Sequence, residues 1–371
     1  MPLKCHDGER EIYSFDVKTN DAWENLREVN RKTKALKMPC CGAALVLRTS
    51  PLGTKHFAHA RRGTCTTKPE TAEHLLAKMF VVEGIQQTVD WTALPEQAGV
   101  TPAGEAWRAD VLALKAKVKV AFEIQWTKQN LEETRRRQRR YADAGVRGLW
   151  LFRQKDFHSG KDIPAFRLAF HEKEKTFDVI LPAPGYDPLC AATDTSDTNS
   201  WGQRVPLARF ITGALEGRLR FAASLGKQMP VEVEGVQIPC WQCKKETRIV
   251  TSLVFAASRI LIGAADIPVS IYDMGDSLPD GAAQVMAILS PALLKHHGIG
   301  EVKPRRSKTE GREYVSNGCI HCDALQGKFY VSHYINDAAK MFETEAIFKA
   351  DWMPQLSEAR PYTEYWWFDE S

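Results

Sequence analysis

Residues 108–126 read RADVLALKAKVKVAFEIQW and decide the fold of the central part of the chain. In the second half of this stretch, apolar and polar side chains alternate with a period of two, which is typical of a strand. RADVLAL is another strand-like run, and the short KAK stretch predicts a hairpin that turns around Ala116. Antiparallel pairing would then set Asp110 opposite residue 122 or 123, so that Asp110 and Glu123 lie side by side.

Helical patterns flank this hairpin on both sides. Upstream, TKPETAEHLLAKMFVVEGI contains a Thr67-x-x-Glu70 capping box, which predicts a helix that begins near Thr67. Downstream, an arginine-rich run is followed by a Gly-marked helix end and by GVRGLWLFR, a short strand pattern. The order of helix, hairpin, helix and strand predicts an α/β unit of about a hundred residues.

The rest of the chain is expected to form separate modules. ATDTSDTNS, residues 192–200, is poor in apolar side chains and suggests a linker. Leu207, Ile211, Leu215 and Leu219 recur every fourth residue and predict an amphipathic helix after it. We therefore expect a small β-rich module at 1–66, an α/β core at 67–185, a linker at 186–206 and an α+β region at 207–371.

Composition indicates a globular protein and leaves its partners open. Of the 371 residues, 44% are hydrophobic and 26% charged, which is enough for a sizeable core. The net charge of +4 neither demands nor excludes a polyanionic partner. There is no segment of signal-peptide or membrane-spanning character, so we expect a cytoplasmic protein without a membrane partner. Oligomeric state is left open by these patterns.

The paired carboxylates predict a site for a divalent ion. Two adjacent carboxylates repel each other unless a cation lies between them, and Mg²⁺ or Mn²⁺ prefers such ligands. A metal site of this kind serves phosphodiester hydrolysis. Gln125 lies on the same strand face as Glu123 and could hydrogen-bond water or phosphate, while Glu73 could complete the metal shell from the upstream helix. The alternative is an acidic, solvent-facing hairpin of ordinary kind.

Two kinds of charged group lie near these carboxylates. His74 and Lys78 follow Glu70 at helical spacing and are further candidates for polar contacts around the site. A cationic helix beside a metal site suits the DNA backbone. The alternative is a solvated helix face held by ion pairs with Glu132 and Glu133. The proposed backbone-binding residues are Arg135, Arg136, Arg137, Arg139 and Arg140.

The cysteines are clustered with the spacings of zinc ligands. Cys240-x-x-Cys243 and Cys319-x-x-Cys322 predict one structural zinc-ribbon-like site in which four cysteines hold Zn²⁺, with free thiols or a redox pair as the alternative. An inserted subdomain must lie between the two pairs. Near the amino end, candidate ligands of a second zinc ion are Cys40, Cys41, His56, His59 and Cys65, led by Cys41, His59 and Cys65. A metal-free β module is the alternative there.

An ordered series of short motifs resembles the competence protein CoiA-like family. The motifs are CCGAALVLR…GTKHFAHARRGTC, ETAEHLLAK, RADV, EIQW, the spacing from Arg137 to Tyr141, and GLWLF, which together cover roughly residues 1–155. That family is similar to the PD-(D/E)XK nuclease superfamily, with its restriction-endonuclease-like fold, and is associated with incoming DNA in natural transformation. The family's C-P-x-C pair is incomplete here, because Met38 takes the place of its first cysteine.

The resemblance implies a function and a set of site residues. Asp110 and Glu123 would be metal ligands, Glu73 the helix acid, and Gln125 would occupy the place where many relatives carry a lysine. The expected function is metal-dependent hydrolysis of DNA, with recombination or DNA-processing proteins as further partners. The alternative is a DNA-binding or scaffold protein that keeps the nuclease fold without turnover.

Overall fold

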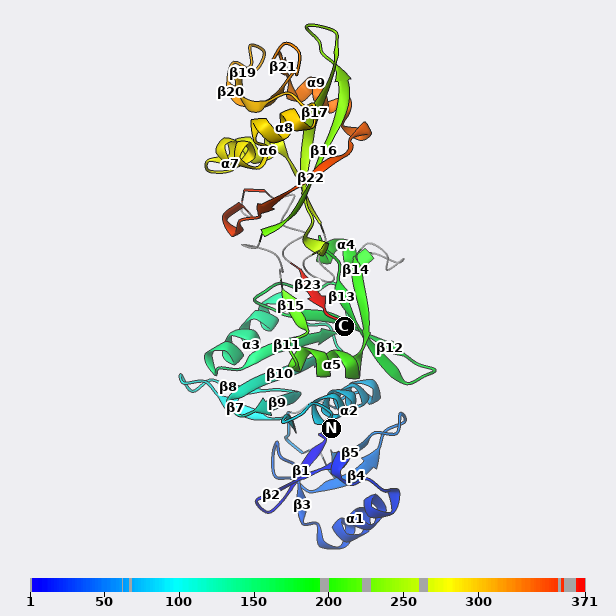
Figure 1. Cartoon of the computed structure of the whole chain (residues 1–371). Coiled ribbons are helices and arrows are strands. Elements are labelled where there is room, and N and C mark those ends of the chain that lie inside the picture. Colours follow the sequence, from blue (N-terminus) through cyan, green and yellow to red (C-terminus); the bar gives the residue numbers. More distant parts are fainter. Residues whose placement is uncertain are drawn as a thin grey trace. The chain divides into compact units, whose positions relative to one another are not determined.

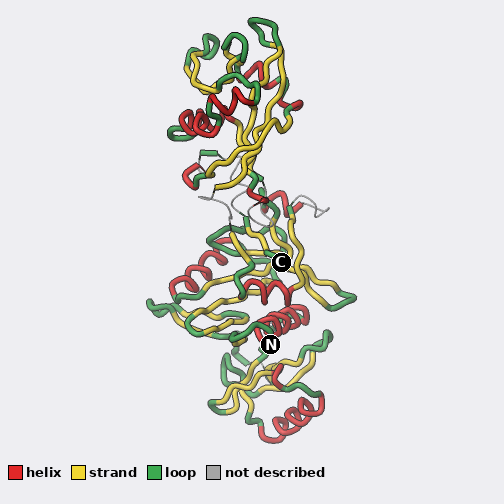
Figure 2. Tube along the Cα trace, viewed as in Figure 1, coloured by secondary structure: helices red, strands yellow, loops and turns green. Residues whose placement is uncertain are grey.

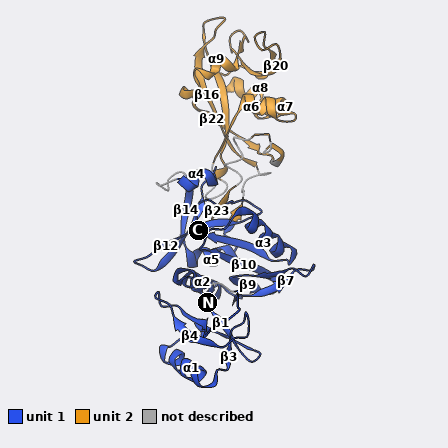
Figure 3. Ribbon diagram, turned by 180° about the vertical axis from the view of Figure 1, so that it is seen from behind, with its two compact units in different colours: residues 1–219, 370–371 blue, residues 220–369 orange. Residues whose placement is uncertain are grey.

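The computed structural model describes residues 2–61, 63–66, 69–193, 200–221, 228–259, 266–352, 355–356 and 365–370. It divides into two compact units, one formed by residues 1–219 with 370–371 and the other by residues 220–369 (Figure 3). Within the described part of the chain, no helix is long and apolar enough to cross a membrane.

The first part of unit 1 is a small module of short strands and one helix (Figure 1). Helix α1 has a Thr19 side-chain cap, and its Trp23 packs on Phe57 in the module's core. Sequence reasoning missed this helix. The elements are β1 (Lys4–Asp7), β2 (Arg10–Tyr13), α1 (Asn20–Thr33), β3 (Leu36–Lys37), β4 (Leu45–Thr49) and β5 (Lys55–His59).

A seven-stranded mixed sheet forms the body of unit 1, in the order β14-β13-β12-β11-β10-β9-β6. The pairs β10–β11 and β11–β12 are parallel, and the remaining neighbours are antiparallel. The strands are β6 (Thr92–Pro95), β9 (Val111–Lys115), β10 (Val118–Gln125), β11 (Arg147–Phe152), β12 (Ala165–His171), β13 (Thr176–Pro182) and β14 (Trp201–Pro206). A two-stranded hairpin of β7 (Ala98–Val100) and β8 (Ala106–Arg108) accompanies them.

Helices cover both faces of this sheet (Figure 2). Helices α2 (Ala72–Gln86) and α5 (Leu207–Leu215) pack against each other, and Phe210 of α5 contacts Phe166 of β12. Helix α3 (Leu131–Asp143) lies on the opposite face, where its Tyr141 shares a core cluster with Ala165, the neighbour of Phe166 on β12. The central strands are therefore buried on both sides, as the α/β prediction requires.

The predicted hairpin is confirmed. Strand β9 pairs with β10 in an antiparallel register that sets Val111 opposite Phe122, and Ala116 takes a positive φ of 51° in the turn. Continuing this register one step places Asp110 beside Glu123. Glu123 is not open to water, however, because it is fully buried beneath α3. The sheet that contains this hairpin and the helices α2, α3 and α5 together form a mixed α/β fold.

Two boundaries differ from expectation. Thr67 lies outside the described residues, and helix α2 begins at Ala72 with the Thr71 side chain accepting the capping hydrogen bond from His74 N–H. The segment expected to be a linker contains α4 (Pro188–Thr193) and β14, which pairs with β13. Trp201 and Val205, both on β14, are buried, so the main sheet continues past the polar stretch. Helix α5 also belongs to unit 1.

Unit 2 is built on a four-stranded antiparallel sheet in the order β18-β17-β16-β22 and a three-stranded sheet β19-β20-β21. Strand β15 (Leu219–Phe221) begins at the last residue of the first segment of unit 1 and continues into unit 2. The other strands of unit 2 are β16 (Gln228–Pro239), β17 (Glu246–Phe255), β18 (Ile267–Ser270), β19 (Val302–Arg306), β20 (Glu313–Gly318), β21 (Leu325–Gln326), β22 (Ala339–Ile347) and β23 (Trp366–Phe368). Its helices are α6 (Ile271–Ser277), α7 (Gly281–Ile288), α8 (Pro291–His296) and α9 (Lys328–Ser332).

Candidate functional site

Asp110 lies immediately before β9, where it accepts one backbone hydrogen bond and lies near an imidazole. The N–H of Ile124 on β10 donates a hydrogen bond of 2.8 Å to Oδ2 of Asp110, and Nε2 of His74 lies 3.5 Å from the same oxygen. Burial opposes ionisation of Asp110, but His74, Lys78 and the Ile124 amide outweigh it and hold its pKa well below the usual range. Asp110 is therefore a fixed negative charge at neutral pH.

Helix α2 brings two further ligand atoms to Asp110. Glu70, His74 and Lys78 follow one another at intervals of four residues, which places them along one side of the helix and the turn before it. One carboxylate oxygen of Glu70, one ring nitrogen of His74 and one oxygen of Asp110 all lie within 4.8 Å of one another. Sequence reasoning singled out Glu73 rather than Glu70, although the four-residue spacing was the available signal.

The donor set of Glu70, His74 and Asp110 fits a divalent metal ion. Two carboxylates and an imidazole are typical ligands of Mn²⁺ and related ions, whereas Mg²⁺ favours oxygen ligands alone. Nε2 of His74 is buried and makes no well-formed hydrogen bond within the described residues, so it is available to a metal. The three side chains are 15–20% exposed, which leaves the cluster within reach of substrate.

Lys78 supplies a buried positive charge behind this cluster. Its side chain is fully buried and forms ion pairs with Glu70, at 3.2 Å, and with Glu96. Burial disfavours the charged lysine, but the carboxylates outweigh that effect and raise its pKa, so Lys78 keeps its proton. Burial likewise opposes ionisation of Glu70, yet the charge of Lys78 holds the pKa of Glu70 below its usual range.

Glu123 is enclosed by helix α3. Its carboxylate has no solvent exposure, and its two oxygens accept hydrogen bonds from Arg137, at 2.5 Å, and from the Tyr141 hydroxyl. Burial raises the pKa of Glu123 to about 8, with the neighbouring charge of Asp110 adding to the rise and Arg137 and Tyr141 opposing it. The backbone register places Asp110 and Glu123 together, but in this structure their carboxylates have different partners.

The other two predicted site residues lie around this centre. Glu73 lines a separate pocket of about 650 Å³ together with Trp126 and Arg153, and it is not one of the three clustered ligands. Gln125 is the last residue of β10 and shares the strand face of Glu123. Its side chain makes no hydrogen bond within the described part of the chain, so it can still contact a ligand.

The arginines of α3 divide into two groups. The helix is capped by the Asn130 side chain, which accepts a hydrogen bond from Glu133 N–H. Arg137 and Arg140 turn inward, toward Glu123 and toward the carbonyl oxygen of Ala106. The outward group is exposed and consists of Arg135, Arg136 and Arg139, of which Arg136 pairs with Glu133 at 2.6 Å.

Unit 2 brings the two cysteine pairs together. Cys240 and Cys243 follow β16, Cys319 and Cys322 follow β20, and their four Sγ atoms lie within 4.8 Å of one another. Sγ atoms of Cys240 and Cys322 are 3.7 Å apart, as are those of Cys243 and Cys319. Strands β17 to β20 and helices α6 to α8 fill the interval between the pairs. Four convergent thiols can hold zinc in a closed tetrahedral site.

The amino-terminal module contains a second cysteine cluster. Cys40, Cys41, His59 and Cys65 place their ligand atoms within 4.8 Å of one another, including 3.2 Å between Cys41 Sγ and His59 Nε2. Cys40 thus joins the three leading candidates, because the turn after β3 brings both adjacent cysteines to the same point. His56 is buried elsewhere, with Nδ1 at 3.2 Å from the carbonyl oxygen of Thr54.

Comparison with known families agrees with the motifs. No curated protein matches the chain. Residues 70–188 match the family model described as the nuclease-like domain of competence protein CoiA. The matched segment contains Glu70, His74, Asp110, Glu123 and all of helix α3. The predicted resemblance is therefore confirmed for this segment: residues 70–188 of the chain are similar to the CoiA nuclease-like domain.

Proposed function

We propose that the segment of residues 70–188 is a restriction-endonuclease-like core that hydrolyses DNA phosphodiester bonds with a divalent metal ion. The observation that carries this proposal is the convergence of Glu70, His74 and Asp110 at the hairpin end where Asp110 and Glu123 are register neighbours. The match of the same segment to a nuclease-like domain supports it.

Asp110, His74 and Glu70 are the proposed protein ligands of Mn²⁺ or Mg²⁺, with Glu123 as a further ligand. A bound divalent ion would supply Lewis acidity toward the phosphate and lower the pKa of a coordinated water. The amide of Ile124 fixes the Asp110 carboxylate in place. Glu73, the helix acid implied by the family resemblance, is assigned to the adjacent pocket beside Trp126 and Arg153.

In the proposed site, the positive charge comes from Lys78 on α2. It does not come from the β10 position of Gln125, where many relatives carry a lysine. Gln125 has no charge and can only hydrogen-bond water or phosphate. Lys78 keeps its proton, so it orients Glu70 and Glu96 electrostatically and does not accept a proton from water. Gln125 would then only orient a metal-coordinated water, whose lowered pKa would let it lose its proton to solvent without a lysine base.

The substrate contacts of the proposal come from α3. Its exposed arginines, Arg135, Arg136 and Arg139, are suited to phosphates along the DNA backbone. We extend the family resemblance to DNA taken up during transformation and to recombination or DNA-processing proteins as partners. The four-cysteine cluster of unit 2 and the amino-terminal cluster of three cysteines and His59 are proposed as structural zinc sites, since a closed shell of four protein ligands leaves no position for substrate.

A second candidate function is DNA binding without turnover. The observation that favours it is the closed environment of Glu123, whose two oxygens are engaged by Arg137 and Tyr141. In this case the nuclease fold would bind DNA while one carboxylate stayed unavailable to metal.

Purified full-length protein distinguishes these candidates. Single-stranded, double-stranded and branched DNA are incubated with Mn²⁺, with Mg²⁺ and with each ion plus excess EDTA, and products and binding are both measured. The enzyme proposal expects cleavage that disappears with EDTA. Salt-sensitive binding without products under every metal condition would establish the second candidate instead, and the absence of binding would contradict both.

A further inference from the structure

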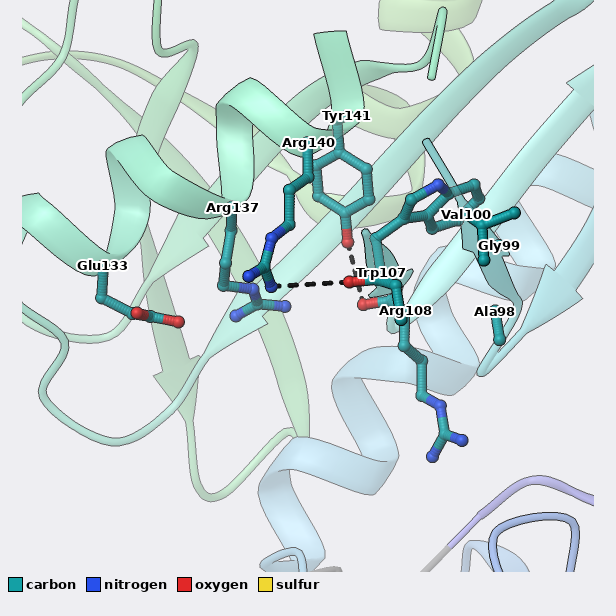
Figure 4. A pocket seen from close by; sticks show the side chains of 10 residues that line it. Ala98, Gly99, Val100, Trp107, Arg108, Glu133, Arg137, Arg140 and Tyr141 are labelled. Atoms are coloured by element: carbon teal, nitrogen blue, oxygen red, sulfur yellow. Dashed lines mark hydrogen bonds between the residues drawn. The ribbon is translucent and has the colours of Figure 1, made fainter. Parts of the chain in front are cut away.

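A pocket of about 650 Å³ lies between the β7–β8 hairpin and helix α3 (Figure 4). It opens next to Glu123 but is not part of the proposed metal cluster. We call it the arginine pocket, and it is lined by Ala98, Gly99, Val100, Ala106, Trp107, Arg108, Glu133, Arg137, Arg140 and Tyr141.

Positive charge dominates the lining of this pocket. Arg108 is exposed and forms no ion pair within the described residues. Arg140 has a distant ion-pair partner, since its Nε lies 3.5 Å from Glu105, whose side chain is 55% exposed, and it also donates a hydrogen bond of 3.4 Å to the carbonyl oxygen of Ala106. Glu133, the single carboxylate of the lining, is paired with Arg136 at 2.6 Å. The pocket therefore favours an anionic ligand.

Two donors of the lining make no well-formed hydrogen bond. Nε1 of Trp107 and Nε of Arg140 are both buried and make no hydrogen bond within the described part of the chain. Unpaired buried donors are rare in native proteins and carry a free-energy penalty. The Arg140 side chain is nevertheless 26% exposed, so its other guanidinium donors can reach a ligand rich in acceptor oxygens, such as a phosphate.

An aromatic wall adds a second recognition element. The indole of Trp107 lies against Gly99, where an added Cβ would come within 2.2 Å of the ring, and it meets Tyr141 edge to face at 5.5 Å. The ring is therefore held on the hairpin by a residue that must lack a side chain. Guanidinium groups combined with a fixed indole suit a nucleotide, which offers both a phosphate and a flat base.

The pocket is joined to the site by two shared residues. Arg137 and Tyr141 line it and also hydrogen-bond the carboxylate of Glu123 (Figure 4). In Figure 4 the guanidinium groups of Arg137 and Arg140 lie near each other, whereas Arg108 extends in another direction. A ligand in the pocket would thus lie beside Glu123.

We propose that the arginine pocket binds one nucleotide of a DNA strand next to the cleaved bond, with its base against Trp107, its own phosphate on Arg140 and the neighbouring phosphate of the strand on Arg108. This inference rests on the proposed function, which makes DNA the substrate. The phosphate belongs either to an internal phosphodiester or to a strand end, because the same guanidinium chemistry accepts both.

The test is the affinity of full-length protein for a fluorescent oligonucleotide, measured by anisotropy without added Mg²⁺ or Mn²⁺. Arg140→Met and Arg108→Met are each expected to weaken binding about tenfold, the loss of one charge-assisted contact. Arg31→Met and Lys32→Met, at two exposed cations of helix α1, are the matched controls and should change affinity less than about twofold. In the pocket variants, the slope of the logarithm of the affinity against the logarithm of the salt concentration should become shallower by about the contribution of one phosphate contact.

Trp107→Leu tests the aromatic wall separately. It is expected to weaken binding without changing the salt dependence, because it removes stacking rather than charge. Trp107→Phe, which keeps an aromatic ring on the hairpin, should restore much of the affinity. Unfolding curves of every variant check that the fold is intact. A 5′-phosphorylated oligonucleotide that binds tighter than its unphosphorylated twin, and only with Arg140 present, assigns the pocket to a strand end; equal binding assigns it to an internal phosphodiester.

The outcomes separate this inference from the proposed function. Pocket variants that bind DNA as well as the two controls would overturn the nucleotide pocket, even if the wild-type protein cuts DNA. Wild-type protein that binds through the pocket but cuts nothing with Mn²⁺ or Mg²⁺ would contradict the nuclease proposal and leave the pocket in place. Wild-type protein that binds no DNA would overturn both.

Discussion

Arg137 and Glu123 form an ion pair of 2.5 Å in which the carboxylate is completely buried. The guanidinium also lies over the ring of Trp150, at 5.0 Å from its centroid, and the Arg137 side chain, which is 24% exposed, lines the arginine pocket. This pair links helix α3 to strand β10. It therefore contributes both to the stability of unit 1 and to the state of a proposed metal ligand.

Arg137→Met should destabilise unit 1 strongly. At pH 9, where Glu123 is ionised, removing one partner of this buried ion pair leaves the other uncompensated, which costs about 3 kcal/mol. Arg136→Met, one position earlier, removes only the surface pair with Glu133 and should cost less than about 1 kcal/mol. Urea unfolding curves measure both. Equal midpoints for the two variants would show that the buried pair carries no stability.

Glu123 should make stability depend on pH in protein without added Mg²⁺ or Mn²⁺. Its ordinary pKa is 4.5 and its pKa in the folded protein is about 8, so the folded state holds one more proton between these values. The free energy of unfolding should therefore fall as pH rises from about 4.5 to about 8, by at most about 1.4 kcal/mol per pH unit.

Glu123→Gln isolates this effect, because glutamine stays neutral throughout. As pH rises from about 4.5 to about 8, the free energy of unfolding of wild type should fall relative to that of Glu123→Gln. A difference that stays constant with pH would mean that Glu123 is ionised in the folded protein at all of these pH values.

The ligands on helix α2 can be assigned by Mn²⁺ titration calorimetry. Glu70→Gln and His74→Ala should each weaken Mn²⁺ binding at least about tenfold, because each removes an atom of the three-residue cluster. Glu73→Gln should change affinity by less than about threefold, since Glu73 lines another pocket. If Glu73→Gln weakens Mn²⁺ binding more than Glu70→Gln does, Glu73 is the helix ligand, as the family resemblance implied.

Each cysteine cluster should hold one zinc ion. Metal analysis of protein prepared without chelators is expected to find a zinc ion for each of the two clusters. Cys319→Ser should lose the ion of unit 2 and lower the stability of that unit, because metal binding and folding are coupled. Cys190→Ser, at an exposed cysteine outside both clusters, should retain both ions. Zinc-free wild-type protein with a stable unit 2 would contradict the assignment.

Local patterns in the sequence predicted the elements that position the site. The period-two alternation and the KAK turn predicted the β9–β10 hairpin in its observed register, because both signals depend on neighbouring residues only. Metal-ligand spacing predicted the four-cysteine cluster for the same reason. The nuclease-like nature of residues 70–188 followed from short motifs in order.

Tertiary contacts decided what the sequence left open. Glu123 was expected on an accessible face, but α3 returns across β10 and buries it against Tyr141. The choice between Glu70 and Glu73 depends on how α2 is rotated on the sheet, which helical spacing alone does not specify. The β7–β8 hairpin and its pocket wall were missed because three-residue strands carry little periodic signal.

The central claim is that Asp110 anchors a metal ion that cleaves DNA. It is tested most directly by the rate of Mn²⁺-dependent DNA cleavage by wild-type protein, Asp110→Asn and the control Asp143→Asn, which alters an exposed carboxylate at the end of α3. We expect Asp110→Asn to lose at least about a hundredfold in rate while it still folds and binds DNA, and Asp143→Asn to cut like wild type. Cleavage by Asp110→Asn at the wild-type rate would contradict the account.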